Sequence, residues 1–372
     1  MDYSKGIKFR LYSTKAQIDV INKHFNACRF VYNHFLDVRQ KAYNKNKETL
    51  NYYACCKLLT ALKQDGEHLW LYEVSNAALQ NSLRDLDRAY QNFFARRGRY
   101  PKFKSRYNNV QSFRLQNGNK QIRVEDGGRV RLPKIGIVKV RPVPEFAGRI
   151  LNATISRTAT GKYFISLCVK QDIELGLNDG GKIGLHFGLR DFYTDDKGNK
   201  ADNPKVLARY EKKLARAQRK LSRRKKGSKN RDKQRLVVAR IHERIANIRK
   251  DFLHKLSLQV VEENSLIAVR DLETKRMLKD PIFAKGISDA SWSEFVRQLQ
   301  YKSFLHGGTV VKIPTEHPSV QLCSVCGYQN EAMKDLRIRE WVCPQCGAHH
   351  ERGENAAVNI LNEALKLEAQ KV

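Results

Sequence analysis

Hydrophobic and polar residues alternate with two different periods along this chain of 372 residues. Ile7, Phe9 and Leu11 lie two residues apart, which predicts a strand near the N-terminus. Between residues 15 and 94 the apolar spacing becomes helical, and from 122 to 170 short alternating runs return. Several short strands with turn residues between them predict a small barrel or sandwich beside a helical block.

The second half of the chain has a different pattern. The stretch 171–182, QDIELGLNDGGK, contains three glycines and few apolar residues, so it reads as a linker, and a new domain is expected near Lys182. LIAVRDL at 266–272 and TVVKIP at 309–314 are short apolar runs typical of buried parallel strands. Because long helical segments separate these runs, we predict an α/β core with a parallel component.

A strongly basic helical hairpin is predicted after residues 202–204, where the sequence DNP is a typical helix start with Asp202 or Asn203 as its cap. The pattern breaks at Gly227 and then resumes with apolar residues at helical spacing. A merely solvated helix is the alternative, but like charges this dense repel one another and favour an anionic partner. The cations of the first arm are Lys212, Lys213, Arg216, Arg219, Lys220, Arg223, Arg224, Lys225 and Lys226.

The charge of the whole chain supports that partner. Lys and Arg number 70 against 38 Asp and Glu, which leaves a formal charge of +32. Such a field favours nucleic acid, with an acidic membrane surface as the competing partner. No apolar run has the length of a membrane-spanning helix, and MDYSKGIKFR lacks the apolar core of a signal peptide, so a cytoplasmic location is expected.

The stretch RRGRYPKFKSR at 96–106 alternates cations with aromatic residues. This pattern is typical of a loop that holds a phosphate backbone and stacks a base, and a solvated basic loop is the alternative. The candidate contacts are Arg96, Arg97, Arg99, Tyr100, Lys102 and Lys104.

Four of the eight cysteines form two CxxC pairs, CSVCG and CPQCG, sixteen residues apart. Each pair lets two thiolates approach one tetrahedral ion, and in a reducing cytoplasm a metal is favoured over two disulfides. We therefore predict a structural zinc site with no open coordination position. Its ligands are Cys323, Cys326, Cys343 and Cys346.

Several stretches together resemble the TnpB (OrfB) family of transposon-encoded RNA-guided nucleases. They run in one order along nearly the whole chain: KFRLYSTKAQIDVINKHFNACRFVYNHFL, LQNSLRDLDRAYQNFF with YPKFKS, GLHFGLRDFYT, LSRRKKGS, AVRDL, SDASWSEFVRQLQYK, the cysteine ribbon and ENAAVNIL. The resemblance implies a WED-like β-barrel (1–12 with 108–178) and an inserted REC-like helical domain (13–107). It also implies an RNase H-like RuvC domain (179–317 with 350–372, basic hairpin 203–257) with an inserted zinc ribbon (318–349).

In this family the nuclease site has three acids, and residue by residue their positions fall here on His186, Arg270 and Gly353. Two-metal cleavage needs anionic oxygens that hold two Mg²⁺ ions about 4 Å apart. An imidazole is a poor Mg²⁺ ligand, a guanidinium repels the metal and glycine has no side chain, so we expect no catalytic Mg²⁺ and no enzyme activity. For His186 a satisfied core imidazole is favoured over a catalytic role.

Neighbouring acids leave an alternative open. Asp271 and Asp191 are expected to face away from the site, whereas Glu351 and Glu354 flank Gly353, and Glu351 has the reach to enter from the start of the last helix. An RNA-guided DNA endonuclease with displaced acids is therefore a rival hypothesis. A non-catalytic nucleic-acid-binding transposon accessory protein is another.

The resemblance implies an omega-RNA-like guide RNA and a double-stranded DNA target as partners, in a monomeric ribonucleoprotein at the bacterial or archaeal nucleoid. With the three acids absent, the expected function resembles that of the nuclease-dead TnpB-like repressors, which block transcription where the guide pairs next to a short adjacent motif. Asparagine and glutamine side chains read adenine edges. The candidate readers of the motif are Tyr52, Asn76 and Gln80.

Overall fold

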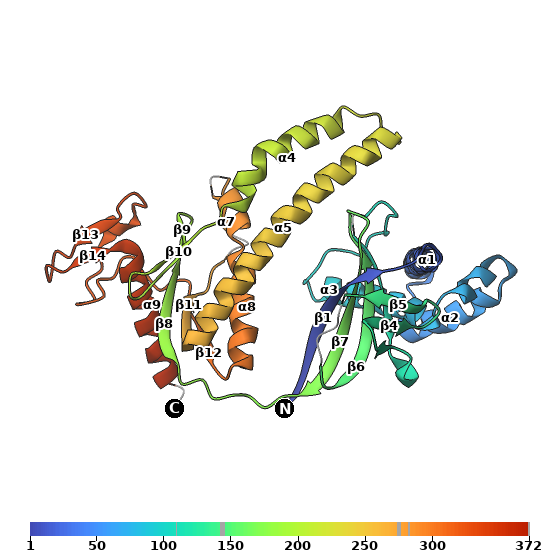
Figure 1. Cartoon of the computed structure of the whole chain (residues 1–372), viewed down its shortest axis with the longest axis horizontal. Helices are drawn as coiled ribbons and strands as arrows, with labels where there is room; N and C mark the ends of the chain where they lie inside the picture. Colours follow the sequence, from blue (N-terminus) through green and yellow to red (C-terminus); the bar gives the residue numbers. More distant parts are fainter. Residues whose placement is uncertain (109, 142–145, 274–276, 282, 371–372) are drawn as a thin grey trace. The chain divides into compact units, whose positions relative to one another are not determined.

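The computed structural model describes residues 1–108, 110–141, 146–273, 277–281 and 283–370. The chain forms two compact units, Met1–Ile173 and Glu174–Val372 (Figure 1). The boundary between them falls inside the predicted linker, 171–182. Residues 142–145, within the predicted run of short strands, lie outside the described residues.

The helical block of the first unit consists of α1 (Lys15–Asn46), α2 (Tyr52–Gln64), the 3₁₀ helix η1 (Gly66–Glu73) and α3 (Asn76–Phe94). Thr14 begins α1 with a reciprocal capping box: its hydroxyl accepts from the Gln17 N–H, and the Gln17 side chain accepts from the Thr14 N–H. The predicted apolar stripe of α1, which includes Ile21, Phe25 and Cys28, is buried. The helices and the adjacent sheet share one continuous hydrophobic core.

The sheet of the first unit has seven antiparallel strands in the order β2-β6-β7-β1-β5-β4-β3. The predicted closed barrel is wrong, because β2 and β3 end the sheet and do not pair with each other among the described residues. A closed barrel requires every strand to pair with a neighbour on both sides, and β3, at one edge of this sheet, is three residues long. The strands are β1 (Asp2–Tyr12), β2 (Gln111–Gln116), β3 (Arg123–Glu125), β4 (Arg129–Leu132), β5 (Gly136–Val140), β6 (Arg149–Arg157) and β7 (Tyr163–Asp172), with the short 3₁₀ helix η2 (Gly118–Lys120) after β2.

The second unit contains a five-stranded mixed sheet in the order β10-β9-β8-β11-β12. The first three strands along the chain are antiparallel, whereas β8, β11 and β12 run parallel. This confirms the predicted parallel component. The strands are β8 (Gly181–Phe187), β9 (Asp191–Asp195), β10 (Lys200–Asp202), β11 (Asn264–Arg270) and β12 (Thr309–Ile313).

Helices cover both faces of this sheet. Leu185 and Val269 on one face pack with Leu253 of α5 and Phe295 of α8, whereas Ala268 on the other face packs with α9. A small ribbon is inserted between β12 and α9. The elements are α4 (Val206–Ser222), α5 (Lys229–Glu263), α7 (Ala284–Ala290), α8 (Trp292–Leu305), η3 (Glu331–Lys334), β13 (Glu340–Val342), β14 (His349–Glu351) and α9 (Arg352–Ala369).

The predicted basic hairpin is formed by α4 and α5 (Figure 1). The two helices pack along an apolar seam. Helix α4 begins at Val206, after the predicted start at 202–204, because the side chain of Asn203 makes other hydrogen bonds. The Asn203 side-chain NH₂ donates to the Leu189 carbonyl, and the Asn203 side-chain oxygen accepts from the Lys205 N–H. Gly227, at φ +84°, lies in the turn between the arms. No helix in the described part of the chain combines the length and apolar character needed to cross a bilayer.

Helix α9 approaches β8 backbone to backbone at Gly184. A Cβ at this position would lie 2.2 Å from the Ala357 carbonyl oxygen, so no other residue fits without a shift of the helix. The glycine therefore determines how closely α9 covers the sheet.

We expect Gly184→Ala to lower the free energy of unfolding by about 1–3 kcal/mol, the usual cost of overpacking. Gly176→Ala is the control, because a Cβ there meets nothing within 4 Å. Denaturant unfolding of both variants measures the difference, and equal stability of the two would contradict the tight contact.

Candidate nucleic-acid and metal sites

The structure brings residues 186, 270 and 353 to one face of the five-stranded sheet. Leu185 of β8 lies opposite Val269 of β11, so His186 and Arg270 follow at neighbouring positions on the face that α9 covers. His186 also lies opposite Thr194 of β9, and a Cβ on Gly353 would lie 2.8 Å from the Thr194 hydroxyl. The three positions predicted from the sequence therefore do converge.

The side chains at these positions are a neutral imidazole and a cationic guanidinium, and Gly353 has none. Burial, together with the nearby cations Arg352 and Arg270, lowers the pKa of His186 to about 4, so the imidazole is neutral at neutral pH. The Arg270 guanidinium is turned to the chain after β12, where its Nε donates to the Thr315 carbonyl at 3.0 Å. Gly353 contributes a backbone N–H.

Glu351 places a carboxylate beside position 353. It caps α9: its Oε2 accepts from the N–H groups of Gly353 and Glu354, both at 2.9 Å. The same oxygen lies 3.1 Å from where a Cβ on Gly353 would be, and Oε1 lies 3.7 Å from Lys200 Nζ. The Glu351 carboxylate therefore lies next to the space that a side chain at position 353 would occupy.

Other acids near these positions are arranged differently. Asp271 is exposed and lies 3.6 Å from Lys312 in an ion pair, and Asp191 begins β9 opposite Asp202. Among the described residues, the groups of three or more possible metal ligands with converging atoms are the four cysteines and the surface group Asp65, Glu67 and His68. No such group includes residue 186, 270 or 353 within those ranges.

The four cysteines converge on one point. Their sulfur atoms lie within 4.8 Å of one another, with Cys323 3.6 Å from Cys346 and Cys326 3.6 Å from Cys343. Four sulfurs bound to a tetrahedral ion at about 2.3 Å are about 3.8 Å apart, so this cluster fits a metal site. Each CxxC turn closes through a glycine at positive φ, Gly327 at +78° and Gly347 at +75°.

One residue at this cluster was missed from the sequence. His350 is buried, and its Nε2 lies 3.0 Å from the Cys323 sulfur. It comes four residues after the last cysteine, and only the pairing of β13 with β14 returns it to the cluster.

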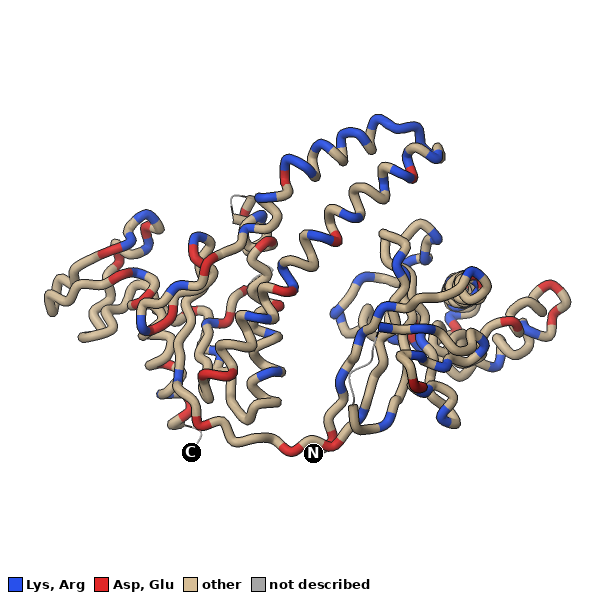
Figure 2. Tube along the Cα trace, in the orientation of Figure 1, with Lys and Arg blue, Asp and Glu red and all other residues tan. Residues whose placement is uncertain are grey.

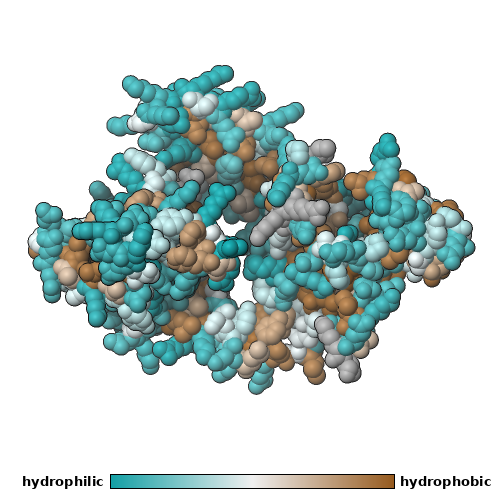
Figure 3. All heavy atoms as spheres, turned by 180° about the vertical axis from the view of Figure 1, so that it is seen from behind, coloured by the Kyte–Doolittle hydropathy of each residue, from teal (hydrophilic) through white to brown (hydrophobic). Residues whose placement is uncertain are grey.

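The basic hairpin carries its cations on the outside. Figure 2 shows lysine and arginine along α4 and around the turn to α5, and Figure 3 shows hydrophilic residues over the outer surface of the hairpin. The first-arm cations other than Lys213 are the candidate contacts. All eight are exposed, and no ion pair joins any of them to a carboxylate in the part of the chain that is described. These residues are Lys212, Arg216, Arg219, Lys220, Arg223, Arg224, Lys225 and Lys226.

The loop after α3 is also an exposed basic surface. Arg96, Arg97, Arg99, Tyr100 and Lys102 are all exposed. The ring of Tyr100 nevertheless packs edge-on against Phe93, with centroids 5.2 Å apart, so part of this aromatic surface is already covered.

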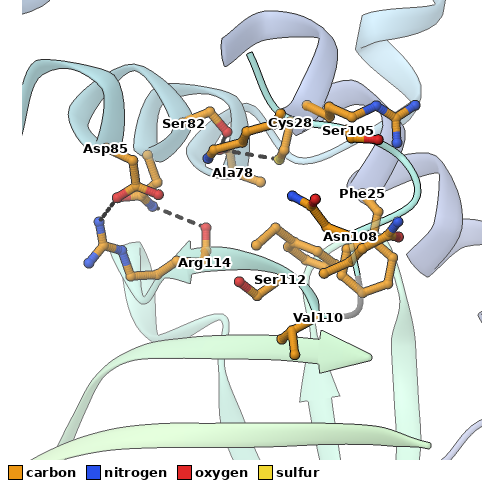
Figure 4. Close-up of a pocket in the computed structure, with 15 residues that line it drawn as sticks. Phe25, Cys28, Ala78, Ser82, Asp85, Ser105, Asn108, Val110, Ser112 and Arg114 are labelled. Atoms are coloured by element: carbon orange, nitrogen blue, oxygen red, sulfur yellow. Dashed lines mark hydrogen bonds and ion pairs between the residues drawn. The ribbon is translucent and has the colours of Figure 1, made fainter. Parts of the chain in front are cut away.

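Lys104, the last of the candidate contacts named in this loop, lines a pocket of about 170 Å³ between α1, α3 and β2 (Figure 4). Its Nζ lies 3.9 Å from the centre of the Tyr32 ring. The Asp85–Arg114 ion pair, at 3.1 Å, lines the same pocket.

The candidate motif readers lie along α2 and α3. Asn76 and Gln80 are one turn apart on α3, and Arg84, one turn further on, donates from Nε to the Tyr52 hydroxyl at 3.1 Å. Asn76 is exposed and accepts a hydrogen bond from Lys63. No pattern in the sequence pointed to Arg84, because only the packing of α2 on α3 places it beside Tyr52.

Three family models match the chain. One described as a probable transposase matches residues 166–280, one described as a Cas12f1-like TNB domain matches 292–360, and a helix-turn-helix domain matches 1–48. In this structure the last range is a strand followed by one long helix.

Two relatives resemble the chain over most of its length. A putative RNA-guided DNA endonuclease of Streptomyces pristinaespiralis is 37% identical over 98% of this chain and 90% of its own length. The putative RNA-guided DNA endonuclease InsQ of Escherichia coli K12 is 31% identical over 87% of this chain and 83% of its own length. The Cas12f1 chain of a Cas12f1–sgRNA–target DNA complex shares the fold, with a TM-score of 0.53, 13% identity and coverage of 97% of this chain and 99% of that one.

The expectation that the chain is not an enzyme is wrong, because relatives that match nearly its whole length are named as putative DNA endonucleases. The side chains of residues 186, 270 and 353 are not the only groups at this place, because the fold also puts the carboxylate of Glu351 beside position 353.

The lowered pKa of His186 predicts a pH-dependent stability. Between pH 6.5 and 4, His186 is protonated in the unfolded chain but stays neutral in the folded protein. The free energy of unfolding therefore decreases as the pH falls, by roughly 1 kcal/mol per pH unit. We expect His186→Gln to flatten this part of the profile, measured by urea unfolding at several pH values. His306→Gln, at an exposed position, is the control; identical profiles for wild type and His186→Gln would refute the assignment.

Proposed function

Because the chain belongs to the TnpB (OrfB) family of putative RNA-guided DNA endonucleases, we propose that it binds a guide RNA and is directed by it to complementary double-stranded DNA beside a short adjacent motif. The observation that carries the proposal is the basic hairpin, with eight exposed cations and no carboxylate partners among the described residues. Cations that remain unpaired in the folded protein are available to phosphates. A complex that stays on its target also obstructs transcription through that site.

We propose different roles for the two units. We assign the sheet of the first unit (1–12 with 108–178) as WED-like and its helices (13–107) as REC-like. We assign the five-stranded sheet and its helices (179–317 with 350–372) as RuvC-like, because three antiparallel strands followed by two parallel ones is an RNase H-like arrangement. The exposed loop at 96–104 and the stripe of Tyr52, Asn76 and Gln80 serve as further nucleic-acid contacts.

We assign zinc to the four cysteines of the ribbon, residues 318–349. Thiolate ligands in two CxxC turns suit zinc, and the sulfur separations of 3.6 Å agree with a tetrahedral site. Four sulfurs leave no position for a substrate, so this ion has a structural role.

The hairpin predicts a strong salt dependence. Replacing Arg223, Arg224, Lys225 and Lys226 with glutamine should reduce the slope of log K against log salt concentration by about 3 to 4, because each phosphate contact contributes about 0.9 for duplex DNA and 0.7 for a single strand. Fluorescence anisotropy over a series of salt concentrations measures the slope.

The matched control neutralises four exposed cations that already have carboxylate partners, Lys41, Lys255, Lys334 and Arg337. This variant loses the same charge, and its slope should change much less. Sequencing of RNA that co-purifies with the protein tests the guide directly. Protein that carries no discrete RNA species, and whose two variants show equal slopes, would contradict the proposal.

Strand cleavage with displaced acids is a second candidate function. The observation that favours it is the position of Glu351, whose Oε2 lies 3.1 Å from the Cβ site of residue 353, together with the names of the relatives. A divalent ion at this place would be bound through the oxygen that is not part of the helix cap, Oε1.

This candidate predicts that the guide-loaded protein cuts matched DNA in Mg²⁺ or Mn²⁺, and that Glu351→Gln abolishes the cut. Glu354→Gln, on the same helical turn but directed toward Gly198, should leave it intact. Gel electrophoresis of labelled target measures scission, and binding measured in parallel separates loss of cutting from loss of target recognition. Intact target with wild-type protein, under conditions in which it is bound, would reject the candidate.

A further inference from the structure

His350 contacts the cysteine cluster without belonging to either CxxC pair. Its side chain is 7% exposed, and its Nε2 lies 3.0 Å from the Cys323 sulfur. The ring packs on Trp341, directly opposite in the β13–β14 ladder, with centroids 4.7 Å apart. The imidazole is therefore held against one sulfur by the strand pairing.

The chemistry of the pair indicates a hydrogen bond. Four thiolates around a divalent ion carry a net charge of about −2, and a buried anionic sulfur is stabilised by an N–H donor. The four cysteines already complete a tetrahedron, so no position is left for a nitrogen ligand. We propose that His350 donates from Nε2 to the metal-bound thiolate of Cys323 and thereby acts as a positioning residue of the metal site, a role that rests on the proposed zinc.

The same contact links the metal to the start of α9. His350 precedes Glu351, which caps α9, and Arg352, whose guanidinium donates to the carbonyls of Asp335 (2.8 Å) and Ile338 (3.2 Å) in the ribbon. These three consecutive residues tie the metal, the helix cap and the ribbon loop together.

A second anchor comes from one turn further along α9. Asn355 accepts from the N–H of Ser324, inside the first CxxC turn, at 2.9 Å and donates to the Leu322 carbonyl at 2.7 Å. Asn359 donates to the same carbonyl at 2.8 Å. The zinc ribbon and the first turns of α9 thus form one hydrogen-bonded unit, and metal occupancy controls the order of the turn that contains Gly353.

The test compares His350→Ala with His349→Ala in the zinc-loaded full-length chain. His349 is the adjacent residue of β14, is exposed and has its Nε2 3.8 Å from Glu340, so it is a matched control on the other face of the strand. Competition with a chromophoric zinc chelator should show zinc affinity at least about 10-fold weaker for His350→Ala, as for other outer-shell partners of metal ligands, and within about twofold of wild type for His349→Ala. His350→Gln, whose amide also donates to sulfur, should recover part of the affinity.

Cobalt substitution separates a hydrogen bond from coordination. The visible spectrum of the Co²⁺ protein should report four sulfur ligands both in wild type and in His350→Ala. A spectrum of three sulfurs and one nitrogen in wild type, lost in His350→Ala, would overturn the assignment, as would equal zinc affinity of the two proteins.

Hydrogen exchange tests the link to α9. The amides of residues 352–357 should exchange faster both in His350→Ala and in wild type stripped of zinc, with circular dichroism confirming that the chain remains folded. Unchanged exchange on zinc removal would refute the coupling. Wild-type protein without stoichiometric zinc would instead refute the zinc proposal, and metal analysis of the wild type distinguishes the two failures.

Discussion

The packing of α9 directly onto β8 is the constraint on which the rest of the second unit depends. Because Gly184 has no side chain, the Ala357 carbonyl reaches the strand, and the same approach brings Gly353 up to Thr194. The first turn of α9 consequently lies beside His186 and Arg270. The ribbon is attached to this turn through Arg352 and Asn355, so one backbone contact places both the candidate site and the metal cluster.

Unbalanced positive charge is the second determinant. An excess of 32 cations is unfavourable in a compact chain unless the charges stay exposed or meet anions. In the hairpin, the cations stay exposed to solvent while α4 and α5 pack through an apolar seam. This seam includes Leu214, Ala217, Val238 and Ile241. In the proposed function, the nucleic acid supplies the missing negative charge.

The chemistry at the three converging positions depends on Glu351. Its Oε2 is engaged by two backbone N–H groups at a helix N-terminus, an arrangement that stabilises the carboxylate in place. Its Oε1 lies 3.7 Å from Lys200, so a divalent ion there would have to compete with this ammonium. The neutral imidazole of His186 and the guanidinium of Arg270, bound to the Thr315 carbonyl, complete the surroundings. In the second candidate function, cleavage depends on this carboxylate.

The sequence by itself determined the local elements and the chemistry that depends on spacing. The periodicity predicted the first strand, the helical block, the parallel strands and the basic hairpin, and the two CxxC pairs predicted a four-sulfur cluster, because these signals depend on near neighbours in the chain. Only the tertiary structure decided that the first sheet stays open, that Arg84 reaches Tyr52 and that His350 contacts Cys323. Each of these results from strand pairing or helix packing between residues that no repeat in the sequence relates, so local patterns carry no information about them.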